Sequence, residues 1–333
     1  MTAMGARLEA LRTALRYGAM AFIVMAWASA LPAWGQAPTP LAVAKVANDF
    51  ALIMGDYGKK LGIFQRDGTD PEISLITQAH MVQATIAGNV EVALASGATL
   101  AFAAKGAPLK AVAALSGPPM ILVLVVRPDN SIPAINALRG RTAAVSNLGS
   151  LTDWAVSQIA ISKGWDPAEI KRVAVGDTPA RVAALRTGNV DAAVIDIAEA
   201  LDLQERDQAK ILINFGDLIK TFQNQIIYAS DKAIAEKPEA VRAFVKGWFE
   251  TISYARKNKA ETVAFARDIL GVRDTVASEV YDQLMHSNFF SPDGVIAAST
   301  LQAMSKSFVE LKLLPAEEDL TRFVTDKFLR AKN

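Results

Sequence analysis

The chain has 333 residues, of which 51% are hydrophobic and 21% are charged, and its formal net charge is +1. This composition fits a globular protein with a large core, and the length suggests two domains. A near-neutral chain without basic runs excludes an electrostatic surface for nucleic acid. Because the sequence contains no cysteine, disulfides, thiolate metal sites and cysteine nucleophiles are also excluded.

The N-terminal segment, residues 1–35, has the pattern of a signal peptide. Three arginines precede an uncharged run at 17–31, which is short for a membrane span of about 20 apolar residues. Small residues at Ala33 and Gly35 suit cleavage after Gly35, and cleavage after Ala37 is the alternative. We expect a soluble, exported protein rather than an uncleaved anchor. The missing cysteine excludes a lipoprotein, and the formal charge of the mature chain becomes −1.

Beyond this segment, short apolar runs alternate with helical patterns. The apolar runs predict strands at 41–47, 71–77, 90–95, 109–115, 121–128, 141–146, 172–175, 190–195 and 225–229. Helical periodicity predicts helices at 50–63, 98–105, 150–162, 238–257, 259–270, 274–286, 296–311 and 316–329. Alternating strands and helices followed by a helical C-terminal region predict an α/β fold with mainly parallel sheets.

A short unit occurs twice, as AGNVEVALASGAT at 87–99 and as TGNVDAAVIDIAE at 187–199. Each copy follows a helical pattern, and its glycine, Gly88 or Gly188, stands where a helix end favours a left-handed backbone. The apolar run after the asparagine predicts a parallel strand that is buried on both faces. The repeat therefore predicts two equivalent helix–turn–strand units, and coincidence between two alanine-rich turns is the alternative.

The ends of these two strands are candidate ligand positions, because open α/β sheets bind ligands beyond the carboxyl ends of their strands. The first end carries Ser96, Gly97 and Thr99, and the second carries Asp196. If two such domains face each other, both ends line one cleft. There is no P-loop and no GxGxxG motif after a strand, so the sequence gives no sign of nucleotide binding.

Four stretches carry a family resemblance and span most of residues 41–260. They are YGKKLGIFQRDGTDPEISLI, QATIAGNVEVALASGAT, SIPAINALRGRTAAV, and RVAALRTGNVDAAVID with the later EKPEAVRAFVKGWFETISYA. In this order and spacing the chain resembles the type II periplasmic solute-binding proteins of ABC importers, in the nitrate, sulfonate and taurine receptor branch. That superfamily also contains the thiamine-pyrimidine synthases.

The resemblance implies a periplasmic protein of two α/β lobes, each a mainly parallel sheet flanked by helices. One lobe would hold residues 41–124 and 229–333 and the other residues 128–224, with hinge crossings at 124–127 and 225–229. The resemblance further implies hinge closure on a small solute and delivery to an inner-membrane ABC permease. We expect a monomer without cofactor and without enzymatic activity.

Two other functions are compatible with such a fold. A ligand-sensing partner of a membrane receptor stays open. A synthase-like enzyme is disfavoured because that chemistry, as the resemblance implies it, uses a cysteine-bearing motif and an active-site histidine. The only two histidines in the sequence, His80 and His286, lack metal-binding spacing, so we expect no metal site. We expect the solute to be a small organic anion, such as a sulfonate or carboxylate, and leave open an additional amine, hydroxyl or aromatic group.

The predicted ligand contacts all follow predicted strands. They are Asn48, Asp49, Phe50, Ser96, Gly97, Thr99, Ser146, Asn147, Gly149, Ser150, Leu151, Thr152 and Asp196. The helix start at 150–152 gathers unpaired N–H groups and partial positive charge, which suit an anion. Helix capping is the alternative role for Asn48 or Asp49, for Ser96 and Thr99, for Ser150 with Asp153, and for Asp196.

Overall fold

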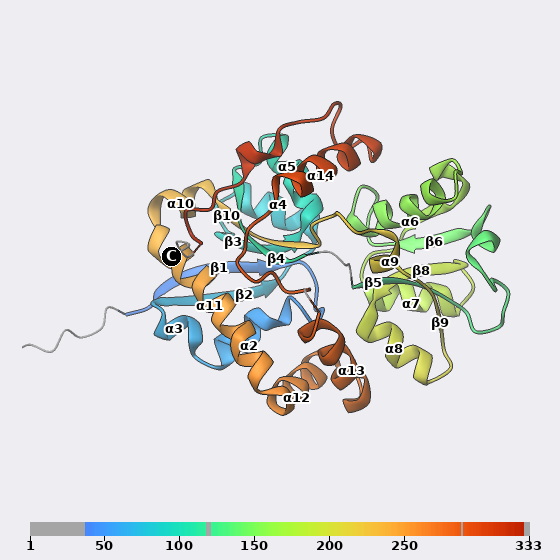
Figure 1. Ribbon diagram of the computed structural model, residues 1–333, viewed down its shortest axis with the longest axis horizontal. Coiled ribbons are helices and arrows are strands. Elements are labelled where there is room, and N and C mark those ends of the chain that lie inside the picture. The colour runs from blue at the N-terminus through green and yellow to red at the C-terminus, as the bar shows by residue number, and fades with distance from the viewer. Residues whose placement is uncertain (1–36, 118–120, 288, 330–333) are drawn as a thin grey trace, which may run out of the picture. The chain divides into compact units, whose positions relative to one another are not determined.

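The computed structural model describes residues 37–117, 121–287 and 289–329, whose strands form two five-stranded sheets (Figure 1). The first sheet has the order β2-β1-β3-β10-β4, and its strands are β1 (Thr39–Lys45), β2 (Thr69–Leu75), β3 (Val92–Ser96), β4 (Leu109–Ser116) and β10 (Gln225–Ser230). The second has the order β7-β6-β8-β5-β9, and its strands are β5 (Leu122–Val126), β6 (Thr142–Val145), β7 (Lys171–Ala174), β8 (Ala192–Asp196) and β9 (Lys210–Asn214). The predicted signal peptide at 1–35 lies outside the described residues.

Each sheet contains one antiparallel strand among parallel ones. β10 runs antiparallel between β3 and β4, and β5 runs antiparallel between β8 and β9. The remaining pairings are parallel. The two sheets therefore share one strand order and one place for the antiparallel strand, which confirms the predicted α/β fold with two mainly parallel sheets. The predicted crossings at 124–127 and 225–229 overlap β5 and β10.

Helices follow most of the strands, and the C-terminal third is mainly helical. The helices are α2 (Ile53–Lys60), α3 (Ile63–Arg66), α4 (Gln78–Ile86), α5 (Leu100–Ala104), α6 (Leu151–Ser162), α7 (Thr178–Arg186), α8 (Ile197–Glu205), α9 (Phe215–Leu218), α10 (Asp231–Glu236), α11 (Pro238–Lys257), α12 (Lys259–Leu270), α13 (Asp274–Met285) and α14 (Ala298–Glu310). Short 3-10 turns occupy Gly97–Thr99, Ile135–Leu138, Pro167–Glu169 and Leu320–Phe323. Within the described residues, no helix is both long and apolar enough to cross a membrane.

The predicted helix at 316–329 is wrong. Only a 3-10 turn forms there, and the chain after it lies alongside β4, where Val324 bridges to Ala111. The Thr325 N–H donates to the Ala111 carbonyl at 2.9 Å, and Phe328 is buried in the core. These long-range contacts cover part of the edge strand of the first sheet, and they outweigh the helical pattern of the local sequence.

The glycine turn of the repeated unit occupies the same place in both sheets, directly before β3 and directly before β8. Gly88 and Gly188 follow α4 and α7 with φ values of 78° and 77°, so the predicted left-handed helix ends are confirmed. After each glycine, the N–H of the asparagine, Asn89 or Asn189, donates to an alanine carbonyl in the preceding helix at 2.8 or 3.0 Å. The same local sequence therefore makes the same turn twice.

The acid of each unit binds the neighbouring strand. Glu91 Oε2 accepts from the Ala42 N–H in β1, and Asp191 Oδ2 accepts from the Thr142 N–H in β6, both at 2.9 Å. The N–H groups of Glu91 and Asp191 donate back to the carbonyls of Ala42 (2.9 Å) and Thr142 (3.0 Å). Because side chain and backbone repeat together, the two units are structurally equivalent and the similarity is not a coincidence.

Replacing the acid of the second unit should therefore weaken its sheet. In Asp191→Ala the Thr142 N–H and Oγ1, which both donate to Asp191 Oδ2, lose their acceptor. We expect the free energy of unfolding to fall by roughly 1–3 kcal/mol, the cost of leaving such groups unpaired. Urea denaturation measures the change. The control Asp217→Ala alters a side chain that is 87% exposed and should stay within about 0.5 kcal/mol of wild type. Equal effects of the two variants would contradict the assigned role.

Candidate functional site

The candidate site lies where strand ends of both sheets meet residues 219–224, which connect α9 to β10 and which we call the return segment. After β3, the Gly97 N–H donates to the Asn224 carbonyl at 3.0 Å. From the second sheet, Trp154 on α6 packs on Phe222 with ring centroids 4.2 Å apart. Phe222 in turn meets Phe308 of α14 edge to face at 6.1 Å. Groups that are far apart in the sequence therefore converge on this segment.

Asp49, just after β1, is buried and bound on both oxygens. Oδ1 accepts from the Leu52 N–H at 2.8 Å, and Oδ2 accepts from Gln225 Nε2 at 2.6 Å. Gln225 Oε1 accepts from Ser116 Oγ at 3.3 Å, which ties the carboxylate to β10 and β4. Burial raises the pKa of Asp49 to about 6, against the opposing effects of these hydrogen bonds and of Lys45. Asp49 thus caps the following helical turn, as the alternative reading anticipates, and also contacts the strand that leaves the return segment.

The two residues next to Asp49 in the sequence lie in different surroundings. Asn48 is exposed. Phe50 is fully buried and packs edge to face against Tyr281 at 6.5 Å, within the hydrophobic core. Of the three residues predicted here, Asp49 is the one that binds β10, the strand that follows the return segment.

The end of β3 brings Ser96 and Gly97 against β10 and the return segment, and Thr99 follows in the 3-10 turn Gly97–Thr99. Ser96 Oγ donates to Gln78 Oε1 at 3.0 Å, and the Ser96 carbonyl accepts from the Tyr228 hydroxyl at 3.0 Å. Gly97 lies so close to the return segment that a Cβ there would fall well under 3.0 Å from the Gln223 carbonyl oxygen. Thr99 is fully buried, and its Oγ1 has no hydrogen-bond partner among the described residues.

In the second sheet, the loop from β6 to α6 forms a hydroxyl cluster of Ser146, Ser150 and Thr152. Ser146 Oγ lies 3.0 Å from Ser150 Oγ and 3.0 Å from Thr152 Oγ1, and the latter two lie 2.8 Å apart. Ser150 caps α6 by accepting from the Asp153 N–H at 3.3 Å. Asp153 Oδ2 accepts from the Gly149 N–H at 2.8 Å, and Gly149 has a φ of 76° that favours glycine. The predicted capping therefore occurs together with the clustering of the hydroxyls.

The other two residues predicted in this loop differ in exposure. Asn147 is exposed, whereas Leu151 is buried in the first turn of α6.

Asp196, the last residue of β8, has one satisfied and one unsatisfied oxygen. Oδ1 accepts from the Ala198 N–H at 2.8 Å and so caps α8, whereas Oδ2 is enclosed without a hydrogen-bond partner among the described residues. Burial raises the pKa of Asp196 well above its usual range, and the negative charge of Asp49 raises it further. The charge of Asp49 therefore acts on Asp196, although the two residues follow strands of different sheets.

Four enclosed polar atoms in this region lack partners among the described residues. They are Thr99 Oγ1, Trp154 Nε1, Asp196 Oδ2 and Asn224 Nδ2. Buried polar groups are normally hydrogen-bonded, and leaving one unpaired costs about 1–3 kcal/mol. The indole, amide and hydroxyl groups supply hydrogen-bond donors, whereas an ionised Asp196 accepts. These four atoms are therefore candidate hydrogen-bonding groups for a ligand.

The polar residues of the return segment are missing from the sequence prediction. Asn224 and the neighbouring Gln223 and Gln225 are all buried, and Gln223 Nε2 donates to the Ser116 carbonyl. Three consecutive amide side chains directly before an apolar strand are the signal that could have identified them. Lys45 is a second omission: it ends the apolar β1, is buried, and pairs with Asp56 at 2.5 Å.

One of the C-terminal helices, α13, also contacts α8, which follows β8 of the second sheet. Arg273, at the start of α13, donates from Nε to Asp202 Oδ1 at 3.0 Å, and its Nη2 lies 2.9 Å from Glu205 Oε2. Both acids lie on α8, the helix that Asp196 caps. This ion-paired contact therefore connects α13 to the helix that begins at the candidate site.

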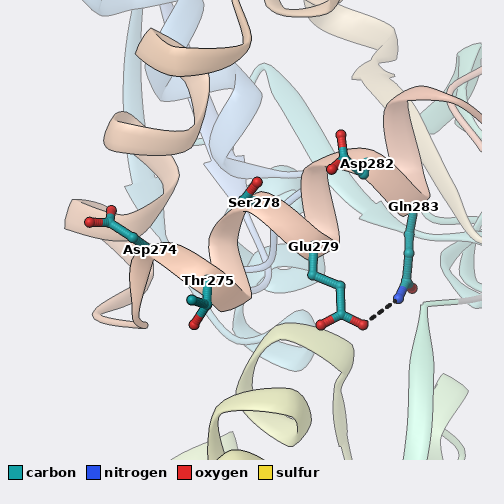
Figure 2. Close-up of a pocket in the computed structure, with 6 residues that line it drawn as sticks. All are labelled: Asp274, Thr275, Ser278, Glu279, Asp282 and Gln283. Atoms are coloured by element: carbon teal, nitrogen blue, oxygen red, sulfur yellow. Dashed lines mark hydrogen bonds between the residues drawn. The ribbon is translucent and has the colours of Figure 1, made fainter.

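A surface hollow of about 720 Å³ lies elsewhere, along α13 (Figure 2). It is lined by Asp274, Thr275, Ser278, Glu279, Asp282 and Gln283. All six come from one helix, and Gln283 Nε2 donates to Glu279 Oε1 at 3.2 Å across the hollow's wall. Because one helix lines only one side of this hollow, it cannot enclose a small molecule. None of the four unpartnered atoms belongs to its lining residues. We therefore place the candidate site at the return segment.

Comparisons with known proteins agree with this architecture. The NMT1/THI5 like family profile matches residues 53–262. No curated protein sequence matches the chain significantly. The alkanesulfonate-binding protein SsuA of Xanthomonas axonopodis pv. citri, bound to MOPS, is similar in structure with a TM-score of 0.73 at 18% identity, over 87% of this chain and 99% of that one.

Two further solved structures show the same fold. The periplasmic aliphatic sulphonate-binding protein SsuA of Escherichia coli matches with a TM-score of 0.70 at 18% identity, over 86% of this chain and 92% of that one. The periplasmic nitrate-binding protein NrtA of Synechocystis PCC 6803 matches with a TM-score of 0.66 at 13% identity, over 87% of each chain. The chain belongs to the NMT1/THI5 like family, and it has the fold of periplasmic sulfonate- and nitrate-binding proteins.

Proposed function

We propose that this protein is an exported receptor that binds a small organic acid and delivers it to an ABC permease of the inner membrane. The observation that carries the proposal is the set of four enclosed polar atoms, at or near strand ends of both sheets, that have no partner among the described residues. The family and the fold shared with sulfonate- and nitrate-binding proteins support it. The protein acts in the periplasm, after removal of residues 1–35, as a monomer.

In this proposal each sheet is the core of one lobe. Residues 41–124 and 229–333 make the first lobe and residues 128–224 the second, and the chain crosses between them twice. The pairing of β5 within the second sheet and of β10 within the first supports one crossing on the N-terminal side of β5 and a return crossing on the N-terminal side of β10. Closure about these two crossings buries the solute between the strand ends.

The acidic group of the solute binds to neutral donors. The first turn of α6 supplies N–H groups and partial positive charge, next to the hydroxyl cluster. Trp154 Nε1, Thr99 Oγ1 and Asn224 Nδ2 supply three further donors in a region from which water is largely excluded. Together these groups can bind the oxygens of a carboxylate or sulfonate without an arginine.

A thermal-shift screen of residues 36–333 tests the proposed function. The panel contains sulfonates, carboxylates, amino acids and pyrimidines. A true solute at 100 times its Kd should add about 2.7 kcal/mol to the free energy of unfolding and raise Tm. Absence of any shift across the panel would contradict the assignment of a small organic acid.

Thr99→Val should separate binding from folding. The valine keeps the shape of threonine but removes a buried hydroxyl that has no partner in the described part of the chain, so we expect unchanged or slightly higher stability without solute. For a solute found in the screen, we expect about tenfold weaker binding, equal to about 1.4 kcal/mol, by calorimetry.

Thr85→Val is the matched control. Thr85 is also buried, but its Oγ1 donates to the Met81 carbonyl at 2.9 Å. This variant should lose about 1 kcal/mol of stability and keep its affinity. The reverse pattern, a destabilised Thr99→Val that binds normally, would show that Thr99 Oγ1 has a purely structural role.

A further inference from the structure

The loop from β6 to α6, which carries the hydroxyl cluster, is held by a buried acid. Asp153 lies in the first turn of α6 and binds the loop at two points. Its N–H donates to Ser150 Oγ at 3.3 Å, and its Oδ2 accepts from the Gly149 N–H at 2.8 Å. The position of this one carboxylate therefore determines where the backbone between Gly149 and Ser150 lies.

Arg172, in the neighbouring strand β7, holds that carboxylate in place. Its Nε lies 3.0 Å from Asp153 Oδ1, and the two side chains are 25% and 9% exposed. Oδ1 has no hydrogen-bond partner among the described residues, so this contact is an ion pair without a hydrogen bond. Arg172 Nη1 also donates to Ser157 Oγ at 2.5 Å, and Ser157 Oγ donates to the Asp153 carbonyl at 3.1 Å. Arg172 therefore contacts Asp153 both directly and through Ser157.

The charge of Asp153 conflicts with the binding of an anion to its loop. The N–H groups of Leu151 and Thr152, in the first turn of α6, have no partner within the helix and are among the donors proposed for the acidic group of the solute. A carboxylate held on Gly149 would repel a negative group at these donors. Within the described residues, Arg172 is the one cation that pairs with Asp153.

We propose that Arg172 is a positioning residue of the candidate site: it fixes Asp153 and cancels its charge, so that the loop can bind the acidic group of the solute. The inference rests on the proposed receptor function and adds a residue that does not itself touch the solute. Arg172 has two separable effects. It keeps the Gly149 N–H bound, with or without solute, and it removes the repulsion that an anion would otherwise meet.

The experiment separates charge from position with two substitutions. Arg172→Met removes the cation but keeps much of the apolar stem, and Asp153→Asn removes the negative charge but keeps an oxygen that accepts from the Gly149 N–H. Wild type, both single variants and the double variant are titrated calorimetrically with ethanesulfonate and with benzoate at constant ionic strength. Arg139→Met is the matched control, because Arg139 pairs with Glu169, and both residues lie outside the loop.

For a probe that binds wild type, we expect Arg172→Met to bind it about tenfold more weakly and Asp153→Asn to bind it more tightly than wild type. The double variant should return to within about threefold of wild type, because it lacks the charge that Arg172 cancels. Arg139→Met should bind as wild type does. A purely structural ion pair predicts weaker binding in both single variants and no recovery in the double variant. That pattern overturns the inference while the receptor function stands, since binding itself is observed.

Amide hydrogen exchange at Gly149 tests the positioning effect without solute. A buried carboxylate without its counter-charge is costly, so in Arg172→Met it should turn toward water and release the Gly149 N–H. We expect exchange at Gly149 to become about tenfold faster, with the amides of β6 unchanged, and to return toward the wild-type rate in the double variant.

If no probe binds wild type, the titrations count against the proposed function, and the exchange rates decide the inference. Unchanged protection of Gly149 in Arg172→Met, or a loss that the amides of β6 share equally, overturns it. If Arg172→Met does not fold, the double variant decides. It folds if the cost is the unpaired charge of Asp153, and its failure to fold overturns the inference.

Discussion

Replacing Gly97 with alanine should lower the free energy of unfolding by about 3 kcal/mol, the upper range for overpacking a buried site. The added Cβ would fall well under 3.0 Å from the Gln223 carbonyl oxygen and 3.1 Å from Met304 Cε. A methionine side chain can move aside, but the Gln223 carbonyl moves only if the backbone of the return segment moves. Urea denaturation should show the loss, and solute binding should weaken because the return segment is displaced from β3.

Gly88→Ala serves as the control for that variant. Gly88 has a φ of 78°, but a Cβ there would meet no atom within 4 Å. This variant should lose only about 1 kcal/mol, from backbone strain, and should retain solute binding. If both variants lost the same amount of unfolding free energy, the close approach of β3 and the return segment would not be a packing constraint.

Asp49 should make the protein less stable as the pH rises. Its pKa is 3.8 in the unfolded chain and about 6 in the folded protein, because burial disfavours the ionised form. The stabilisation from the retained proton is therefore complete below pH 3.8, and it is lost as the pH rises through 6. A rise from 3.8 to about 6 corresponds to about 3 kcal/mol.

Asp49→Asn lacks this titration and also removes the charge that raises the pKa of Asp196, so the difference between the two proteins reports the titration of this coupled pair. Between pH 3.8 and 7 the difference in unfolding free energy should shift by about 3 kcal/mol in favour of the variant. The altered hydrogen bond to Gln225 changes the free energy of unfolding of the variant by the same amount at every pH. It therefore does not alter the expected pH-dependent shift. Urea midpoints at pH 4, 5, 6 and 7 measure it, with the exposed Asp217→Asn as the control. Parallel curves for wild type and Asp49→Asn would contradict the raised pKa.

The repeated unit was the most informative part of the sequence. Glycine at a helix end and a buried apolar run are local signals, and both are confirmed at Gly88 and Gly188. The role of Glu91 and Asp191 was not predictable, because their partners lie 49 residues away in neighbouring strands. Local chemistry sets the turn, whereas the strand order decides what the acid binds.

In the candidate site, too, the local signals were predictable from the sequence and the long-range contacts were not. Strand ends indicated Asp49, Thr99 and Asp196, because parallel strands end at one edge of a sheet. Sequence spacing could not show that Gly97 and Trp154 both contact the return segment, since these contacts depend on the path of that segment in the folded chain. The helix expected at 316–329 fails for a related reason, because pairing with Ala111 of a distant strand determines the backbone there.

The position of β10 also sets an order for folding during synthesis. The second sheet is built from one continuous stretch, β5 to β9, whereas the first lacks the strand between β3 and β4 until residues 225–230 have left the ribosome. The first 116 residues therefore cannot complete their hydrogen-bonded ladder early. The second sheet can therefore form before the first, and the first sheet acquires its final form only when β10 inserts between β3 and β4.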